Sequence, residues 1–224
     1  RLTANPIKVF DDIDGIKNIL NLSKNQKVKR VFFSSSSEIY GEPITLPQNE
    51  EDSPLDCKLP YPVVKKVGEI LLKAYFDEFG MNYTIFRFFN TYGPNQSEDF
   101  VIPNFLRNAK SNLPIYIYGD GSQTRTFCYV DDNIDTIYRC LTENVGNLET
   151  INIGSNIETS IFDLAKLIIK ITKSKSEIIF LKPTLKRYDQ LRRKPDIGKM
   201  QNILDRDLIP LEDGLKKLLL HMNK

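Results

Sequence analysis

Apolar and polar positions follow two different periods along the chain, and stretches of one period alternate with stretches of the other. Residues 1–25 carry apolar side chains at helical spacing, whereas residues 28–34 form a short apolar run typical of a buried strand. The same patterns predict further helices over 61–79, 100–110, 130–143, 160–172 and 211–221, and further strands over 82–89, 115–118, 150–154 and 178–181. Helices that alternate with strands predict an α/β fold.

Breaker residues separate these elements. The segment 41–60 contains four prolines with acidic residues between them, so we expect neither a helix nor a central strand there. Gly80 follows the helix predicted over 61–79 and is a plausible C-cap. The segment 184–197 is rich in arginine and lysine and is predicted to be a basic loop.

The composition argues against nucleic-acid binding, a membrane span and a metal site. A net charge of +2 without an arginine-rich stripe argues against a nucleic-acid partner. No apolar run approaches the roughly 18 residues of a membrane span, and the first residues show no signal-peptide pattern, so we expect a cytoplasmic protein without a membrane partner. Cys57, Cys128 and Cys140 lack C-x-x-C spacing and the chain has one histidine, which predicts reduced thiols and no metal site.

The candidate chemistry lies where the first predicted strand ends and the helix after the proline-rich loop begins. The strand ends in Ser34-Ser35-Ser36-Ser37-Glu38, and the helix opens with Tyr61 and Lys65 at positions i and i+4 of one face. A free phenol has a pKa of about 10, and a nearby ammonium group favours the phenolate. Tyr61 is therefore a candidate general base for a substrate hydroxyl, and Ser36 a candidate hydrogen-bond partner of that hydroxyl. The alternative is a surface pair that supports only the helix.

A second polar segment follows the next predicted strand. Residues 90–95 come directly after the strand over 82–89, as 34–38 follow the first strand. Because ligands of open α/β sheets bind at the carboxyl ends of strands, we expect 34–38 and 90–92 to share one site.

Taken together, these motifs resemble the extended short-chain dehydrogenase/reductase superfamily, specifically its NAD-dependent nucleotide-sugar epimerases, dehydratases and decarboxylases. The resemblance covers nearly the whole chain. The segments that carry it, in chain order, are 33–41, 61–65, RFFNTYGP at 87–94, GDGSQTRTF at 119–127, YVDD at 129–132, NIG at 152–154 and RRKPDI at 192–197.

The resemblance implies a fold, a cofactor and roles. The fold is a partial Rossmann-like, doubly wound parallel sheet without its first strand–helix units, followed by a smaller C-terminal α/β substrate lobe. Residues 1–93 are then the end of the NAD-binding domain, and 94–224 mainly bind the nucleotide sugar. Tyr61 is the base, Lys65 adjusts it, Ser36 and Glu38 complete the catalytic set, and Tyr61, Lys65 and Ser34 contact NAD.

The resemblance also implies a substrate class. Ser37, Asn90, Arg125 and Arg193 match positions that hold the diphosphate or sugar of a nucleotide sugar, here a UDP-sugar. The Ser37-Glu38 pair differs from the Asp-Glu pair of 4,6-dehydratases and resembles UDP-glucuronate decarboxylases and some 4-epimerases. We therefore expect decarboxylation of UDP-glucuronate to UDP-xylose, with 4-epimerisation as the alternative and a homodimer as the assembly.

Two features depart from the family pattern. Pro62 and Val64 stand where relatives usually carry a small residue and often a serine. No G-x-G-x-x-G or G-x-x-G-x-x-G motif, which would bind the pyrophosphate, occurs in the 224 residues. Three explanations remain open: a fragment of an enzyme, a partner that supplies the missing part, or a non-catalytic partner subunit that no longer binds cofactor.

Overall fold

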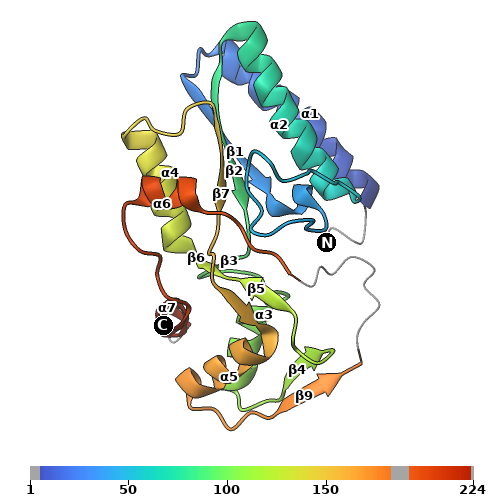
Figure 1. The fold of residues 1–224 in the computed structure, drawn as a ribbon, viewed down its shortest axis with the longest axis vertical. Helices are drawn as coiled ribbons and strands as arrows, with labels where there is room; N and C mark the ends of the chain where they lie inside the picture. Colours follow the sequence, from blue (N-terminus) through green and yellow to red (C-terminus); the bar gives the residue numbers. More distant parts are fainter. Residues whose placement is uncertain (1–5, 183–191, 223–224) are drawn as a thin grey trace. The chain divides into compact units, whose positions relative to one another are not determined.

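The computed structural model describes residues 6–182 and 192–222. The α/β alternation is confirmed, and the elements are labelled in Figure 1. They are η1 (Pro6–Phe10), α1 (Asp11–Asn25), β1 (Arg30–Ser36), η2 (Ser37–Tyr40), α2 (Pro60–Phe79), β2 (Asn82–Phe88), β3 (Thr91–Tyr92), α3 (Val101–Lys110), β4 (Ile115–Tyr118), β5 (Thr124–Thr126), β6 (Cys128–Tyr129), α4 (Val130–Thr142), β7 (Glu149–Ile153), β8 (Glu158–Ser160), α5 (Ile161–Thr172), β9 (Ile178–Leu181), α6 (Gly198–Leu204) and α7 (Leu211–His221).

The chain folds into two compact units, each assembled from three segments. The first unit comprises Arg1–Phe89, Asp135–Ile153 and Pro195–Asp205. The second unit comprises Asn90–Ile134, Gly154–Lys194 and Arg206–Lys224. The chain therefore passes from one unit to the other repeatedly, including between Lys194 and Pro195.

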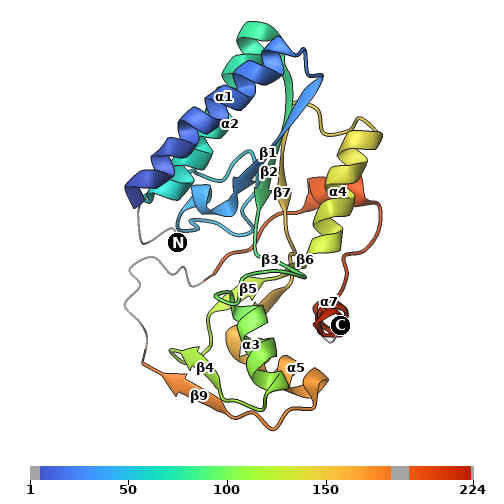
Figure 2. The same cartoon turned by 180° about the vertical axis from the view of Figure 1, so that it is seen from behind.

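The first unit is built on a parallel sheet with strand order β1-β2-β7. Helices α1 and α2 lie side by side over one face of this sheet, as both views show (Figures 1 and 2). Leu20 of α1 and Leu72 of α2 pack with Ile85 of β2 in a core cluster between these helices and the sheet. Apolar residues that recur at helical spacing in α1 and α2 thus pack against those of the strands in a single core.

Helix α2 illustrates how local sequence sets these elements. The helix begins at Pro60, where the lack of an N–H costs nothing in a first turn. It ends at Gly80, which adopts the left-handed conformation with φ of 66° and donates its N–H to the Phe76 carbonyl at 2.8 Å. The predicted C-cap is confirmed, because a residue without Cβ adopts this conformation at no steric cost.

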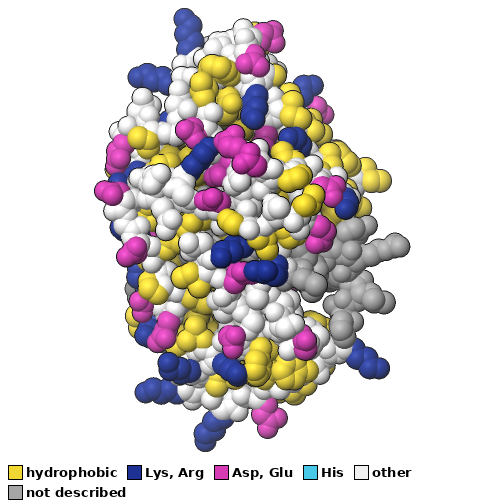
Figure 3. Space-filling view, viewed as in Figure 1, with side chains coloured by type: hydrophobic (Ala, Val, Ile, Leu, Met, Phe, Trp, Pro, Cys, Tyr) yellow, Lys and Arg dark blue, Asp and Glu magenta, His cyan; other side chains and the backbone are white. Residues whose placement is uncertain are grey.

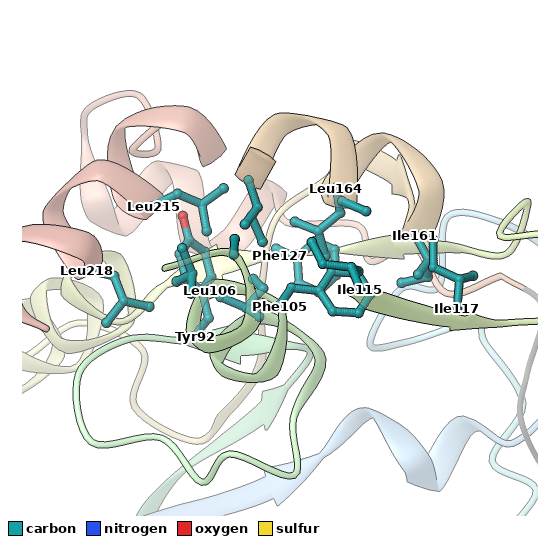
Figure 4. Close-up of a cluster of buried hydrophobic side chains, with 14 of the residues drawn as sticks. Tyr92, Phe105, Leu106, Ile115, Ile117, Phe127, Ile161, Leu164, Leu215 and Leu218 are labelled. Carbon is teal, nitrogen blue, oxygen red and sulfur yellow. The ribbon is translucent and has the colours of Figure 1, made fainter. Parts of the chain in front are cut away.

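The second unit has its own apolar core. Helices α3, α5 and α7 contribute buried side chains to it together with β4 and β6, and Figure 4 shows the labelled ones gathered in one cluster. Strand β4 pairs in parallel with β9, and β5 pairs antiparallel with β8. The members of this core labelled in Figure 4 are Tyr92, Phe105, Leu106, Ile115, Ile117, Phe127, Ile161, Leu164, Leu215 and Leu218.

Some elements differ from the sequence-based expectations. The two-residue and three-residue strands β3, β5, β6 and β8 and the seven-residue helix α6 were not predicted. The helix expected over 1–25 is a 3-10 turn followed by an α-helix from Asp11, and residues 1–5 lie outside the described part. The basic loop expected over 184–197 is described only from Arg192 onward, where Pro195 forms an isolated bridge with Gln48.

The surface agrees with the near-neutral charge. On the face seen in Figure 3, basic and acidic side chains are interspersed among apolar ones and form no continuous basic stripe. None of the helices described in this structure combines the length and the apolar character that a membrane crossing requires.

Candidate active site

The serine-rich end of β1 carries the first residues of the candidate site. Parallel pairing places Ser36 beside Phe88 of β2, so the two strands reach the same edge of the sheet together. Ser36 is buried and caps η2, its hydroxyl oxygen accepting a hydrogen bond from the Glu38 N–H at 3.2 Å. The strand thus ends at Ser36, and the chain turns abruptly at the point where the candidate hydroxyl groups lie.

Helix α2 supplies the other half of this arrangement. Pro62 lies in its first turn and does not interrupt it, as a proline is tolerated there. Tyr61 and Lys65 lie one helical turn apart, and the Lys65 Nζ is 5.6 Å from the centroid of the Tyr61 ring. The i and i+4 positions therefore share a face, as the spacing predicts.

Three side chains converge from these two elements. The Ser36 hydroxyl lies close enough to the Tyr61 phenol to lower its pKa. The Lys65 ammonium donates a hydrogen bond to the Ser34 carbonyl oxygen at 2.8 Å, which ties α2 to the end of β1. Four residues singled out in the sequence, Ser34, Ser36, Tyr61 and Lys65, therefore lie together in the first unit.

Burial dominates the protonation of this group. It raises the pKa of Tyr61, and the negative charge of Glu38 adds to that rise, while the nearby Ser36 side chain opposes it. Burial likewise lowers the pKa of Lys65. In the cofactor-free chain Tyr61 is therefore a neutral phenol at neutral pH, and a fall in its pKa with the help of a cofactor charge remains a prediction.

The two residues after Ser36 have different surroundings. Ser37 is buried at the start of η2, whereas Glu38 is half-buried in the first turn of the same short helix. The effect of Glu38 on the Tyr61 pKa places a carboxylate within electrostatic reach of the phenol. A half-buried carboxylate beside a phenol has the chemistry of an acid–base partner.

A buried ion pair next to Ser35 was not predicted from the sequence. Arg87 of β2 donates to both carboxylate oxygens of Glu69 on α2, at 3.0 and 2.9 Å, and both side chains are at most 4% exposed. Ser35 donates to the same carboxylate at 2.6 Å. The signal was available, since an arginine between Phe86 and Phe88 of a buried strand requires a buried partner.

The remaining candidate residues belong to the second unit. The Asn90 carbonyl accepts a hydrogen bond from the Cys128 N–H at 2.9 Å, which fixes the backbone after β2. Arg125 lies in β5 opposite Thr159, and its Nη1 donates to the Thr124 carbonyl at 2.7 Å. Arg193 is half-buried in the segment before α6. These three residues are placed within their own unit, and a site shared with Ser36 and Tyr61 remains a prediction.

The first unit fits the reactive end of a dinucleotide cofactor. A phenol, an ammonium group and a strand-end hydroxyl offer the donors that a ribose and a carboxamide require. Tyr61, Lys65 and Ser34 are the residues that would hold this end of the molecule. The residues that hold a pyrophosphate in such folds have no counterpart motif among the 224 residues.

Comparisons with known proteins identify the family. Residues 3–154 match the family described as the NAD dependent epimerase/dehydratase family. UDP-glucuronic acid decarboxylase 1 of Xenopus tropicalis is 35% identical over 98% of this chain and 53% of its own length. UDP-N-acetyl-alpha-D-glucosaminuronate decarboxylase of Bacillus cytotoxicus is 36% identical over 92% of this chain and 67% of its own length. The chain thus spans about half to two thirds of these curated relatives.

Solved structures agree with the sequence relatives. UDP-glucose 4-epimerase of Thermotoga maritima, solved with UDP-glucose, superimposes with a TM-score of 0.88 at 26% identity, covering 99% of this chain and 74% of that one. UDP-glucuronic acid 4-epimerase of Bacillus cereus, solved with UDP-glucuronic acid and NAD, gives a TM-score of 0.83 at 30% identity, covering 94% and 67%. The fold is therefore Rossmann-like. With a serine, a tyrosine and a lysine gathered at the end of β1 and a family match over most of its length, this chain belongs to the NAD-dependent epimerase/dehydratase family.

Proposed function

We propose that this chain forms the catalytic and sugar-binding part of an enzyme that decarboxylates UDP-glucuronate to UDP-xylose. The observation that carries the proposal is that Ser36, Tyr61 and Lys65 lie together at the end of β1, with the Lys65 ammonium fixed on the Ser34 carbonyl. The curated relatives that are UDP-glucuronic acid decarboxylases support the choice of reaction. In this proposal, residues 1–93 belong to the cofactor domain and 94–224 mainly bind the sugar nucleotide, with the chain crossing between the two.

The proposed chemistry begins at the sugar C4 hydroxyl. Ser36 would orient the hydroxyl and Tyr61 would take its proton; NAD, when bound, would supply the reversible hydride acceptor for C4. The resulting 4-ketone is β to the carboxylate, so the C5–C6 bond breaks and its electron pair forms an enolate as carbon dioxide leaves. C5 is then protonated and Tyr61 returns its proton to O4.

Tyr61 needs help to act as a base. Its pKa is raised by burial and by Glu38, so the proton transfer requires a positive charge or a further donor near the phenol oxygen. Lys65 has a lowered pKa but lies close enough to contribute once its hydrogen bond to Ser34 is exchanged for one within the site. Glu38 is proposed as the acid group that delivers the proton to C5, after its carboxylate has itself taken up that proton from solvent water.

Substrate binding is assigned to Ser37, Asn90, Arg125 and Arg193. Arginine suits this task because its planar fork binds phosphate or carboxylate with two hydrogen bonds. We assign Arg193 to the sugar carboxylate and Arg125 to the diphosphate. A homodimer and a cytoplasmic location remain predictions, which sedimentation of the purified protein and fractionation of the cells would check.

The test is product analysis with the full-length protein. Incubation with NAD and UDP-glucuronate is expected to yield UDP-xylose and carbon dioxide, detected by NMR spectroscopy and by the loss of the carboxylate mass. The Tyr61→Phe variant is expected to lose about 10²-fold or more in kcat while retaining NAD binding. Formation of UDP-galacturonate would instead support the 4-epimerase alternative. Failure of every form of the protein to bind NAD would contradict the enzyme assignment and support a non-catalytic subunit.

A further inference from the structure

The carboxylate of Glu158 joins the two segments that carry the candidate substrate arginines. It accepts hydrogen bonds from the Arg192 Nε at 2.9 Å and Nη2 at 2.7 Å, so the guanidinium group is bound by its fork. It also accepts a hydrogen bond from the Thr124 hydroxyl at 2.9 Å. Thr124 directly precedes Arg125, and Arg192 directly precedes Arg193.

We propose that Glu158 is a positioning residue, which fixes Arg192 and thereby orients the adjacent Arg193 toward the carboxylate of a sugar-acid nucleotide. This inference rests on the proposed function, since it assigns the determinant of acid specificity within that site. The bidentate contact restricts both the direction and the plane of the Arg192 guanidinium group. The backbone of the next residue is restricted with it.

The surroundings of Glu158 favour a positional role over a stabilising one. Glu158 lies at the start of β8, opposite Thr126 of β5, and its side chain is 18% exposed. The Arg192 side chain is 56% exposed, and exposed ion pairs contribute little to global stability. The two hydrogen bonds between Glu158 and Arg192 have near-ideal lengths, but Arg192 is mostly exposed. The pair therefore orders the chain around Arg192 and adds little to the stability of the core.

Beyond Lys194 the chain belongs to the first unit and makes its contacts there. Pro195 forms a bridge with Gln48, the Asp196 N–H donates to the Gln48 carbonyl at 2.8 Å, and Asn152 Nδ2 donates to the Asp196 carbonyl at 3.2 Å. Arg193 and Lys194 are thus the two residues between the contacts of Arg192 and those of Pro195.

The charge on Glu158 is constant over the range in which the enzyme would be assayed. The hydrogen bond with Arg192 is the main cause that lowers the pKa of Glu158 to about 2. Because this pKa is depressed, the ion pair is complete above the ordinary pKa of a glutamate and is lost only as the pH falls toward 2. Any effect of removing the pair should therefore be the same from about pH 6 to pH 8.

The experiment compares two ligands that differ in the carboxylate. Dissociation constants for UDP-glucuronate and UDP-xylose are measured by calorimetry on the full-length protein with NAD, in a Tyr61→Phe background that prevents turnover. Glu158→Gln is expected to weaken UDP-glucuronate binding about tenfold and UDP-xylose binding less than twofold, because a misplaced cation affects only the carboxylate. Arg192→Gln should give the same selective loss, and the double variant should be no worse than either single variant.

Three controls separate the possible outcomes. Glu212→Gln removes a carboxylate whose partner, Lys216, lies 2.8 Å away in the same unit, and it should change neither affinity. Arg192→Lys keeps the charge without the fork and should give an intermediate loss, which also provides a test if Glu158→Gln does not fold. Arg193→Gln tests the proposed function itself, since loss of selectivity for UDP-glucuronate is expected there regardless of Glu158.

Two results would overturn the inference. Equal losses for both ligands in Glu158→Gln would indicate a general structural role, and unchanged affinities would indicate none. If Arg193→Gln is selective and Glu158→Gln is not, the positioning role alone is wrong. If Arg193→Gln is also without effect on UDP-glucuronate, the assignment of the carboxylate site in the proposed function is wrong.

Discussion

Replacing Glu69 with glutamine should destabilise the protein strongly, although the two side chains have almost the same size and shape. Glu69 is 2% exposed, and its two oxygens accept from the Nε and Nη2 of Arg87 and from the hydroxyl of Ser35. Glutamine keeps the shape and one acceptor oxygen. Its NH2 group, however, faces donors that need an acceptor, and the guanidinium charge stays buried without its counter-ion.

The magnitude follows from the loss of one partner of a buried pair. Removing one member costs about 3–5 kcal/mol, since the other charge remains out of water without compensation. Arg87 retains hydrogen bonds to the Tyr40 hydroxyl at 2.9 Å and to the Glu50 carbonyl at 3.2 Å, which places the expected loss near the lower end. We expect the free energy of unfolding to fall by about 3 kcal/mol.

The assay is urea denaturation followed by circular dichroism, with equal m values as the condition for comparing midpoints. Glu51→Gln is the matched control, because Glu51 pairs with Lys199 at 2.8 Å but is 72% exposed, and it should change the free energy by less than about 0.5 kcal/mol. Replacing Glu69 and Arg87 together with methionine should cost less than Glu69→Gln alone. A single variant within about 1 kcal/mol of wild type would refute the reasoning.

Three further predictions address packing, a buried anchor and the phenol. Gly68→Ala should destabilise the protein by about 1–3 kcal/mol in the same assay, because a Cβ there would overlap the Phe33 ring between α2 and β1; an unchanged midpoint would contradict it. Asp132→Asn should cost about 1–3 kcal/mol, since this buried carboxylate accepts from Arg206 at 2.6 Å and from the Ile209 N–H at 2.9 Å; Asp131→Asn, which alters an exposed carboxylate, is the control. Tyr61 should titrate above the ordinary tyrosine pKa of about 10 in the cofactor-free protein, measured as the ultraviolet difference between wild type and Tyr61→Phe; ionisation below that value would show that Lys65 outweighs burial.

Local rules predicted the parts of the fold that depend on neighbouring residues. The end of α2 at Gly80 and its start near Pro60 follow from single residues whose backbone preferences are strong. Strands β3 and β6 have two residues each, so no alternation of side chains can reveal them. Helix α6 has seven residues and therefore too few turns for a helical period to be recognised.

The buried pair of Glu69 and Arg87 could not be predicted from the sequence for a different reason. Each residue is anomalous within its own element, since a charge interrupts an apolar helix face or strand. The sequence indicates that each needs a partner but gives no choice among the other charged residues of the chain. Only the packing of α2 against β2, which depends on the order of strands in the sheet, brings these two together.

The candidate site shows the same limit in its electrostatics. The i and i+4 spacing correctly predicts that Lys65 lies beside Tyr61, yet it does not by itself set the phenol pKa, which burial raises in the cofactor-free chain. The reason is that a side chain on a helix face also forms hydrogen bonds with other elements of the fold. Lys65 donates to the Ser34 carbonyl of β1, and β1 together with α2 buries the phenol. A pKa depends on all the surfaces that close around a group, so a motif identifies the participants in a reaction without fixing the protonation state from which they start.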